Sequence, residues 1–172
     1  LDAGARMVNI TGPEGFGKTR IAMQCIRKVE ADCPGGVALV SLRDTQDITE
    51  VLLATAAALG MALGDELSGS ITERIGNAIA SRGRSIILFD GFEAHLDSGL
   101  LNTWIRTASD ARFLVTGQTP ILSERATHLH LGKMNDFDGR ALFLARSHRC
   151  SRGQERTPRA TQVELSEGIT EG

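Results

Sequence analysis

The sequence predicts an α/β fold, with helices on both faces of a five-stranded, mostly parallel sheet. The main observation is an alternation of two patterns. Short apolar runs typical of buried strands are followed by longer segments whose apolar residues recur at helical spacing. This alternation is typical of β-α-β units, whose right-handed crossovers place helices on both sides of a sheet. A second observation is the length of 172 residues, with 41% hydrophobic and 23% charged residues, which fits one globular domain.

Five apolar runs are the predicted strands. The run at 36–42 is continuous and follows a Pro-Gly turn signal, as expected of a strand buried on both faces. The run at 85–89 carries the strongest strand pattern in the chain, and the run at 127–131 the weakest. The predicted strands are 7–10, 36–42, 85–89, 112–116 and 127–131.

Helical spacing predicts most of the segments between the strands. Ser70 to Glu73 matches a capping box, in which the two side chains satisfy each other's backbone N–H groups. Residues 147–157 are polar and rich in arginine, which predicts a loop. The predicted helices are 21–26, 44–60, 70–83, one capped by Asp97 or Ser98, one capped by Asn135 that runs through Ala145, and one opened by Thr157 and Pro158.

A phosphate-binding loop lies between the first strand and the first helix. It reads Gly12-Pro13-Glu14-Gly15-Phe16-Gly17-Lys18-Thr19, the pattern G-x-x-x-x-G-K-[ST]. The glycines let the backbone N–H groups point at an anion, and the following helix adds its positive N-terminal end. Lys18 can reach the β- and γ-phosphates, and the Thr19 hydroxyl can ligate Mg²⁺. The loop therefore predicts nucleotide binding with Mg²⁺.

Three further residues complete the candidate site. Asp90 ends a buried strand at the edge where open α/β sheets bind ligands, so it is expected to hold Mg²⁺, through water; the alternative is that it caps the next helix. Glu93 either orients or deprotonates an attacking water, or is a free surface carboxylate. Thr116 either senses the γ-phosphate or simply ends its strand. The predicted catalytic residues are Lys18, Asp90 and Glu93, and the predicted metal ligands are Thr19 and Asp90.

Composition argues against several other functions. The net charge of -2 gives no overall attraction to nucleic acid or to a membrane surface, and no apolar run is as long as a membrane span. The arginines near the C-terminus have no interleaved aromatic residues and read as a solvated loop. The three cysteines, Cys25, Cys33 and Cys150, lack metal or redox spacing. We expect a cytoplasmic domain that binds neither membrane nor nucleic acid directly.

Four segments resemble the STAND class of P-loop NTPases, signal-transduction ATPases related to AAA+ and NB-ARC domains. Gly4 to Arg20 resembles their opening, G-A-R-x-V-x-[LI]-T-G-P-x-G-x-G-K-T-R, and so adds Arg20 to the expected nucleotide-binding residues. The segment 89–96 resembles L-D-N-x-E-x-x-L, and 112–122 resembles R-x-L-x-T-S-R-x-x-L. The segment 129–143 resembles L-x-L followed by E-A-x-x-L-F.

The resemblance implies a three-layer P-loop NTPase fold with strand order 5-1-4-3-2. It implies an NTPase core at 1–148, then an Arg-rich loop and a C-terminal helix at 149–172 that lead to a lid domain. The implied ligands are ATP or ADP with Mg²⁺, and the implied partners are other domains of a larger protein. We expect residues 1–172 alone to be monomeric, since oligomerisation in this class usually needs those other domains.

The same resemblance implies an ATP-binding switch domain of a multidomain signalling or transcriptional regulator, with slow ATP hydrolysis. The alternative is a nucleotide-binding protein-interaction module that does not hydrolyse ATP. One departure keeps both interpretations open. Where relatives carry an arginine after Thr-Ser, this chain has Gln118, which brings no charge to the γ-phosphate.

Overall fold

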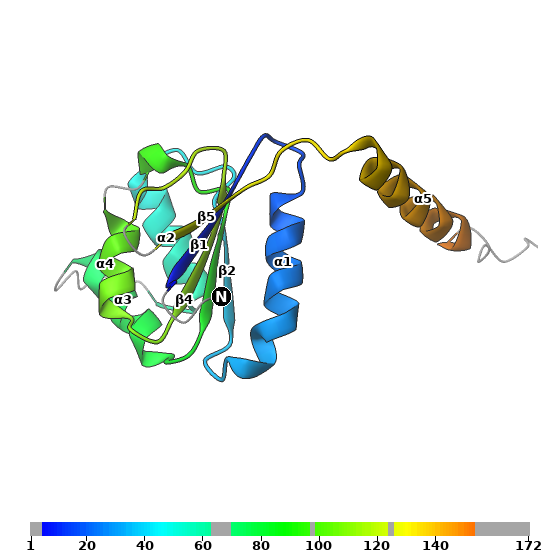
Figure 1. Cartoon of the computed structure of the whole chain (residues 1–172). Helices are drawn as coiled ribbons and strands as arrows, with labels where there is room; N and C mark the ends of the chain where they lie inside the picture. The colour runs from blue at the N-terminus through cyan, green and yellow to red at the C-terminus, as the bar shows by residue number, and fades with distance from the viewer. Residues whose placement is uncertain (1–4, 63–69, 97–98, 124–125, 154–172) are drawn as a thin grey trace, which may run out of the picture. The chain divides into compact units, whose positions relative to one another are not determined.

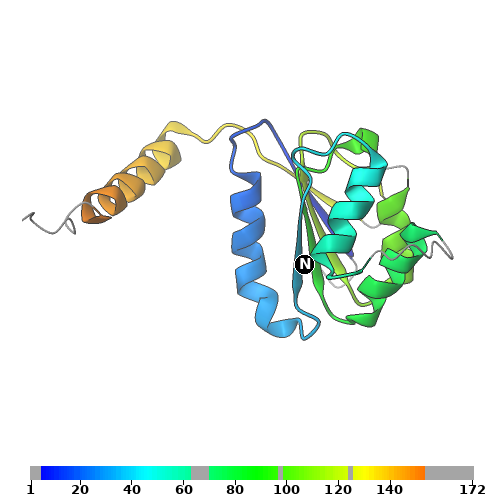
Figure 2. The same ribbon diagram turned by 180° about the vertical axis from the view of Figure 1, so that it is seen from behind.

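The computed structural model describes residues 5–62, 70–96, 99–123 and 126–153 (Figure 1). The chain divides into two compact units, Leu1–Gly132 and Lys133–Gly172, and each is described by itself. The first unit has the predicted α/β fold, in which one parallel sheet lies between two layers of helices (Figures 1 and 2).

The sheet confirms the predicted strand order. Its strands are β1 (Met7–Thr11), β2 (Val37–Ser41), β3 (Ile86–Asp90), β4 (Arg112–Gly117) and β5 (Ala126–His130). They lie in the order β2-β3-β4-β1-β5, and every neighbouring pair is parallel. All carboxyl ends therefore meet at one edge of the sheet, here called the carboxyl edge, and all amino ends meet at the opposite edge, here called the amino edge.

The helices cover both faces of this sheet. They are α1 (Lys18–Val29), α2 (Ile48–Ala58), α3 (Ile71–Ser81) and α4 (Leu100–Thr107), with 3-10 turns at Glu30–Asp32 and Ala94–Leu96. Helix α1 packs Ala22 and Ile26 against one face, whereas α2, α3 and α4 share a larger apolar cluster on the other. Strands buried on both faces have no polar alternation, which is why the runs in β3 and β4 were recognisable in the sequence. The prediction that the run at 36–42 is also buried on both faces is wrong, because β2 is the outer strand of the sheet and its residues alternate in burial, with Leu39 51% exposed.

Trp104 is the centre of the larger cluster. Its ring is fully buried and stacks on Phe89 of β3, with ring centroids 5.7 Å apart. Its indole N–H donates to the carbonyl oxygen of Thr72 at 2.9 Å, so the one polar atom of the side chain is satisfied. The tryptophan thus joins α4 to α3 and to the strand that ends at Asp90.

Two of the predicted helix caps are wrong. Ser70 is the N-cap residue of α3, but its side chain makes no cap hydrogen bond; instead the N–H of Glu73 donates to the Ser70 carbonyl oxygen at 2.9 Å. Helix α4 begins after Gly99, in the left-handed conformation at φ 86°, rather than after Asp97 or Ser98, which lie outside the described residues. The Glu73 N–H, which a capping box would pair with the Ser70 hydroxyl, is thus bonded to a backbone carbonyl instead.

The second unit contains helix α5 (Asp136–Gly153). The predicted cap is confirmed, since Asn135 Oδ1 accepts from the N–H of Asp138 at 2.7 Å. The predicted loop is wrong over 147–153, and α5 continues across the expected boundary after residue 148. Between Arg140 and Arg152 the sequence has no glycine or proline that would end a helix. The helix expected from Thr157 lies outside the described residues. No helix in the described part of the chain is long and apolar enough to span a membrane.

Candidate nucleotide-binding site

Three glycines shape the loop between β1 and α1. Gly12, Gly15 and Gly17 have φ angles of 145°, 78° and 83°, a region that other residues rarely adopt. A Cβ atom on Gly12 would also lie 2.5 Å from the carbonyl oxygen of Leu131, the residue after β5. Gly17 is the N-cap residue of α1, so the free N–H groups of the first helical turn begin at the loop. This is the strand-loop-helix context that the phosphate-binding motif requires.

Lys18 folds back over the loop. Its Nζ donates to the carbonyl oxygens of Gly12 and Pro13, both at 2.8 Å. The ammonium group therefore lies at the loop itself, close to the backbone N–H groups, where a polyphosphate would need a positive charge.

Asp90 is the centre of the polar contacts at the carboxyl edge. Its Oδ1 accepts from the hydroxyl of Thr19 at 2.5 Å and from the hydroxyl of Thr116 at 2.6 Å. The alternative that Asp90 caps the next helix is wrong, because Gly99 holds that position in α4. The loop threonine and the strand-end aspartate, 71 residues apart in sequence, are thus brought into direct contact.

Thr116 is the partner of Asp90 in the sheet. The two residues are register partners of β4 and β3, and the Thr116 side chain is fully buried. Its hydroxyl donates to Asp90 and accepts from the N–H of Gly91 at 3.1 Å. The predicted strand-end position is confirmed, and its hydrogen-bonding capacity is used to orient the carboxylate.

Arg43 is a site residue that the sequence reasoning missed. It follows β2, and its Nε donates to Asp90 Oδ2 at 2.9 Å. Its Nη2 lies 2.9 Å from the same oxygen and donates to the Thr19 hydroxyl, also at 2.9 Å. A signal was available, since β2 neighbours β3 in the expected strand order and a charge just after β2 must lie beside Asp90.

These contacts determine the ionisation of Asp90. Burial raises the pKa of its carboxyl group, but the hydrogen bonds from Thr116, Thr19 and Arg43, together with the charge of Arg43, more than offset burial. The net result is a pKa below the usual value of 3.8. Asp90 is therefore a carboxylate at neutral pH, as a metal ligand must be.

A cleft of about 660 Å³ opens around these groups. Of the predicted site residues, it is lined by Glu14, Gly15, Gly17, Lys18, Thr19, Arg20, Asp90, Glu93 and Thr116. Gly12, Pro13 and Phe16 do not line it; the first two accept from Lys18, and Phe16 is 37% exposed. Leu42, Arg43, Thr45, Gly91, Gly117 and Gln118 complete the wall. The cleft thus combines the ends of β1, β2, β3 and β4.

Glu93 lies on the far wall of the cleft. Its Oε1 accepts from the backbone N–H of Gln118 at 3.3 Å, which ties the loop after β3 to the loop after β4. The two loops are in close contact, because a Cβ atom on Gly117 would collide with the carbonyl oxygen of Phe92. Glu93 is therefore part of the site, with one oxygen bonded and the side chain half-buried.

The residues at Asp90 fit a Mg²⁺ ion that also binds phosphate. Mg²⁺ prefers six oxygen ligands and usually takes only one or two from the protein. The Thr19 hydroxyl and the Asp90 carboxylate provide such oxygens, already in contact. The described residues contain no group of three or more His, Cys, Asp or Glu that could hold a metal without other ligands.

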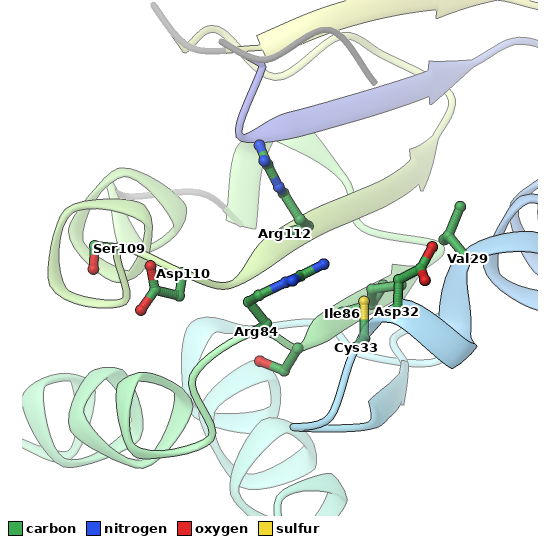
Figure 3. A pocket seen from close by; sticks show the side chains of 9 residues that line it. Val29, Asp32, Cys33, Arg84, Ile86, Ser109, Asp110 and Arg112 are labelled. Atoms are coloured by element: carbon green, nitrogen blue, oxygen red, sulfur yellow. The ribbon is translucent and has the colours of Figure 1, made fainter.

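A second cavity, of about 380 Å³, lies at the amino edge of the sheet (Figure 3). It is lined by Val29, Asp32, Cys33, Arg84, Ser85, Ile86, Ser109, Asp110 and Arg112. Figure 3 shows Arg84 extended toward Asp32 and Cys33, whereas Arg112 points toward the start of β1, where its Nη1 donates to the Ala5 carbonyl oxygen at 2.7 Å. Among the described residues, its lining includes no glycine and no residue from the first turn of an α-helix, so the cleft at Asp90 is the better nucleotide site.

The fold and this site define a P-loop nucleotide-binding class, and the family comparison agrees. A family model described as an AAA domain matches residues 2–125. The chain therefore belongs to the AAA domain family. No curated protein matches the sequence.

Several solved structures share the fold at low sequence identity. Drosophila ORC bound to DNA superposes with a TM-score of 0.63 at 18% identity, covering 88% of this chain and 44% of that chain. Cdc6p from Pyrobaculum aerophilum gives 0.61 at 11% identity, with 86% and 45% covered. The ORC2 protein of Aeropyrum pernix, in ADPNP-ADP complexes, gives 0.59 at 15% identity, with 85% and 46% covered. The chain thus spans less than half the length of these structures.

Proposed function

We propose that this chain is an ATP-binding switch domain, with slow Mg²⁺-dependent ATP hydrolysis, within a multidomain signalling or transcriptional regulator. The observation that carries the proposal is the contact between Thr19 of the glycine loop and Asp90 of β3 at 2.5 Å. In this arrangement the loop can bind the phosphates of a nucleotide, while the neighbouring carboxylate binds the Mg²⁺ that accompanies them.

Each residue then has a role. The backbone N–H groups of residues 14–19 surround the phosphates, and Lys18 exchanges its bonds to loop carbonyls for bonds to phosphate oxygens. Thr19 and Asp90 would hold Mg²⁺, which would supply positive charge beside the phosphates. Thr116 keeps Asp90 in place, and Glu93 orients the attacking water from the far wall. Asp90 is the last residue of the buried strand β3, which fixes the position of its backbone.

Adenine as the base is supported by resemblance and by the ADPNP-ADP complexes of the Aeropyrum ORC2 protein. The role within a larger regulator is supported by the resemblance to the STAND class and by the partial span of the similar structures. We propose no direct DNA binding by this domain, although the Drosophila ORC structure contains DNA. The net charge of -2 gives the chain no overall attraction to a polyanion such as DNA.

A second candidate function is nucleotide binding without hydrolysis. Gln118 favours it, because this residue lines the cleft where the resembled family carries an arginine. A neutral amide cannot stabilise charge that develops on the γ-phosphate during transfer. Turnover by the parent protein, measured as released phosphate, separates the two candidates.

Titration calorimetry with Mg-ATP tests the shared part of both candidates. Lys18→Ala removes the charge at the loop and is expected to weaken binding at least tenfold, about 1.4 kcal/mol. Arg84→Ala is the matched control, since it removes an exposed positive charge at the amino edge. Unchanged affinity in a folded Lys18→Ala protein would show that the loop does not hold the nucleotide.

A further inference from the structure

We propose that Arg43 is a built-in cation that takes the place of Mg²⁺ at Asp90 and competes with it. The inference rests on the proposed function and adds a mechanism for metal dependence to the same site. Arg43 is expected to support nucleotide binding when Mg²⁺ is absent and to oppose Mg²⁺ when it arrives.

The contacts of Arg43 carry this inference. Its guanidinium bonds both of the expected metal ligands, Asp90 at 2.9 Å and Thr19 at 2.9 Å. Its hydrogen-bond donors thus lie on the oxygens where Mg²⁺ would bind. A guanidinium has no lone pair to offer a metal and cannot become a ligand itself. Since both cations would use Thr19 and Asp90, Arg43 and Mg²⁺ compete for these two residues.

The backbone of Arg43 is held, whereas most of its side chain is exposed to solvent. The N–H of Leu42 donates to the Asp90 carbonyl oxygen at 2.8 Å, which continues the pairing of β2 and β3 to the residue before Arg43. Gly91, at φ 85°, leaves so little room that a Cβ atom there would lie 2.9 Å from Arg43 Cγ and 3.2 Å from its Cα. The Arg43 side chain is nonetheless 60% exposed, against 14% for that of Asp90.

A held backbone and an exposed guanidinium are what a displaceable cation requires. A guanidinium that leaves Asp90 stays within the same cleft, because its Cα cannot move far. There it faces the phosphates with a charge that pairs well with phosphate oxygens. Before displacement it neutralises Asp90, which would otherwise repel a polyphosphate that arrives without a metal.

The test measures ADP affinity by titration calorimetry, once with a chelator and once over a range of Mg²⁺ concentrations. Arg43→Gln is expected to weaken Mg²⁺-free ADP binding about tenfold, and to lower the Mg²⁺ concentration for half-maximal tightening about threefold. Arg43→Lys keeps the charge and is expected to bind Mg²⁺-free ADP more tightly than Arg43→Gln. Arg84→Gln, a charge removal at the amino edge, is the control and keeps both values of the parent protein.

Arg43→Gln is thus expected to weaken Mg²⁺-free ADP binding and yet to make Mg²⁺ effective at a lower concentration. A purely structural role of Arg43 would not change these two quantities in opposite directions. If Arg43→Gln weakens ADP binding equally with and without Mg²⁺, or changes neither, the inference is wrong while the proposed function stands. If the parent protein binds ADP under neither condition, the proposed function fails and this inference fails with it. If Arg43→Gln binds Mg²⁺-free ADP more weakly but responds to less Mg²⁺, and Arg84→Gln does neither, the result supports the proposed function and this inference.

Discussion

The two edges of the sheet carry similar residues but differ in how these are connected. Both cavities contain arginine and aspartate side chains. At the carboxyl edge, Asp90 accepts hydrogen bonds from Thr19, Thr116 and Arg43. At the amino edge, within the described part of the chain, no side-chain hydrogen bond or ion pair joins Asp32, Arg84 or Asp110. Residue type alone therefore does not define a site; convergence on one buried carboxylate does.

The parallel sheet explains why convergence occurs at the carboxyl edge. Each strand there leads into a loop, and four such loops meet over Asp90. The glycine loop after β1 leads directly into α1, so the free N–H groups of the first turn of α1 also face the site. The chain reaches the amino edge from the ends of helices, where carbonyl groups rather than N–H groups point outward. Anions are therefore favoured at one edge only.

The largest expected effect concerns the glycine loop and tests how tightly the carboxyl edge is constrained. Gly12→Ala adds a Cβ atom 2.5 Å from a backbone oxygen at φ 145°, and is expected to cost about 3 kcal/mol or more of the free energy of unfolding. Gly36→Ala is the control before β2: φ is 75° and a Cβ atom there meets nothing within 4 Å, so about 1 kcal/mol is expected. Urea unfolding measures both, and equal losses would contradict the crowding argument.

The next effect concerns the far wall of the cleft. Glu93→Gln keeps the shape of the side chain but removes its charge, so ATP affinity is expected to stay within about twofold while turnover falls about a hundredfold, near 2.7 kcal/mol. Asp110→Asn removes an exposed carboxylate at the amino edge and is expected to keep both values. Phosphate release under saturating Mg-ATP is the measurement. Turnover at the parent rate in Glu93→Gln would make Glu93 a surface residue.

The sequence predicted most of this architecture because two strong signals agree. Strands buried on both faces leave continuous apolar runs, and the glycine loop needs a strand before it and a helix after it. The resemblance then supplied the strand order, which the structure confirms. Asp90 and Thr116 could be located because each stands at the end of such a run. Their direct contact follows from the register of β3 and β4.

The parts that sequence reasoning missed depend on contacts that are not local. Arg43 is an ordinary charged residue until β2 and β3 are placed side by side. The cap of α3 failed because a backbone hydrogen bond replaced the expected side-chain one. Helix α5 extends beyond the predicted end because a polar, Arg-rich composition does not by itself end a helix. Arginine is a good helix former, and between Gly139 and Gly153 the sequence has no glycine or proline that would end a helix.

A smaller effect is expected when the charge absent from position 118 is restored. Gln118→Arg places a guanidinium on the cleft wall, where it can pair with oxygens of a γ-phosphate but not with ADP. The ratio of ATP to ADP affinity is expected to rise about threefold to tenfold, or about 0.7–1.4 kcal/mol. Ser109→Arg adds the same charge at the amino edge and is expected to leave the ratio unchanged. Equal ratios in all three proteins would refute a role for position 118.

The smallest expected effect is the pH dependence of stability that Asp90 confers. Its pKa in the folded protein lies below the ordinary value of 3.8, so its contribution is fully present above that value and is lost as pH falls through the folded pKa. The free energy of unfolding of the parent protein should therefore fall more steeply below about pH 4 than that of Asp90→Asn. Urea unfolding at stepped pH values measures these slopes.

Identical slopes in the parent and in Asp90→Asn would contradict this prediction. They would mean that the hydrogen bonds from Thr19, Thr116 and Arg43 do not outweigh the burial of the carboxylate. The two edges of the sheet would then differ in shape alone.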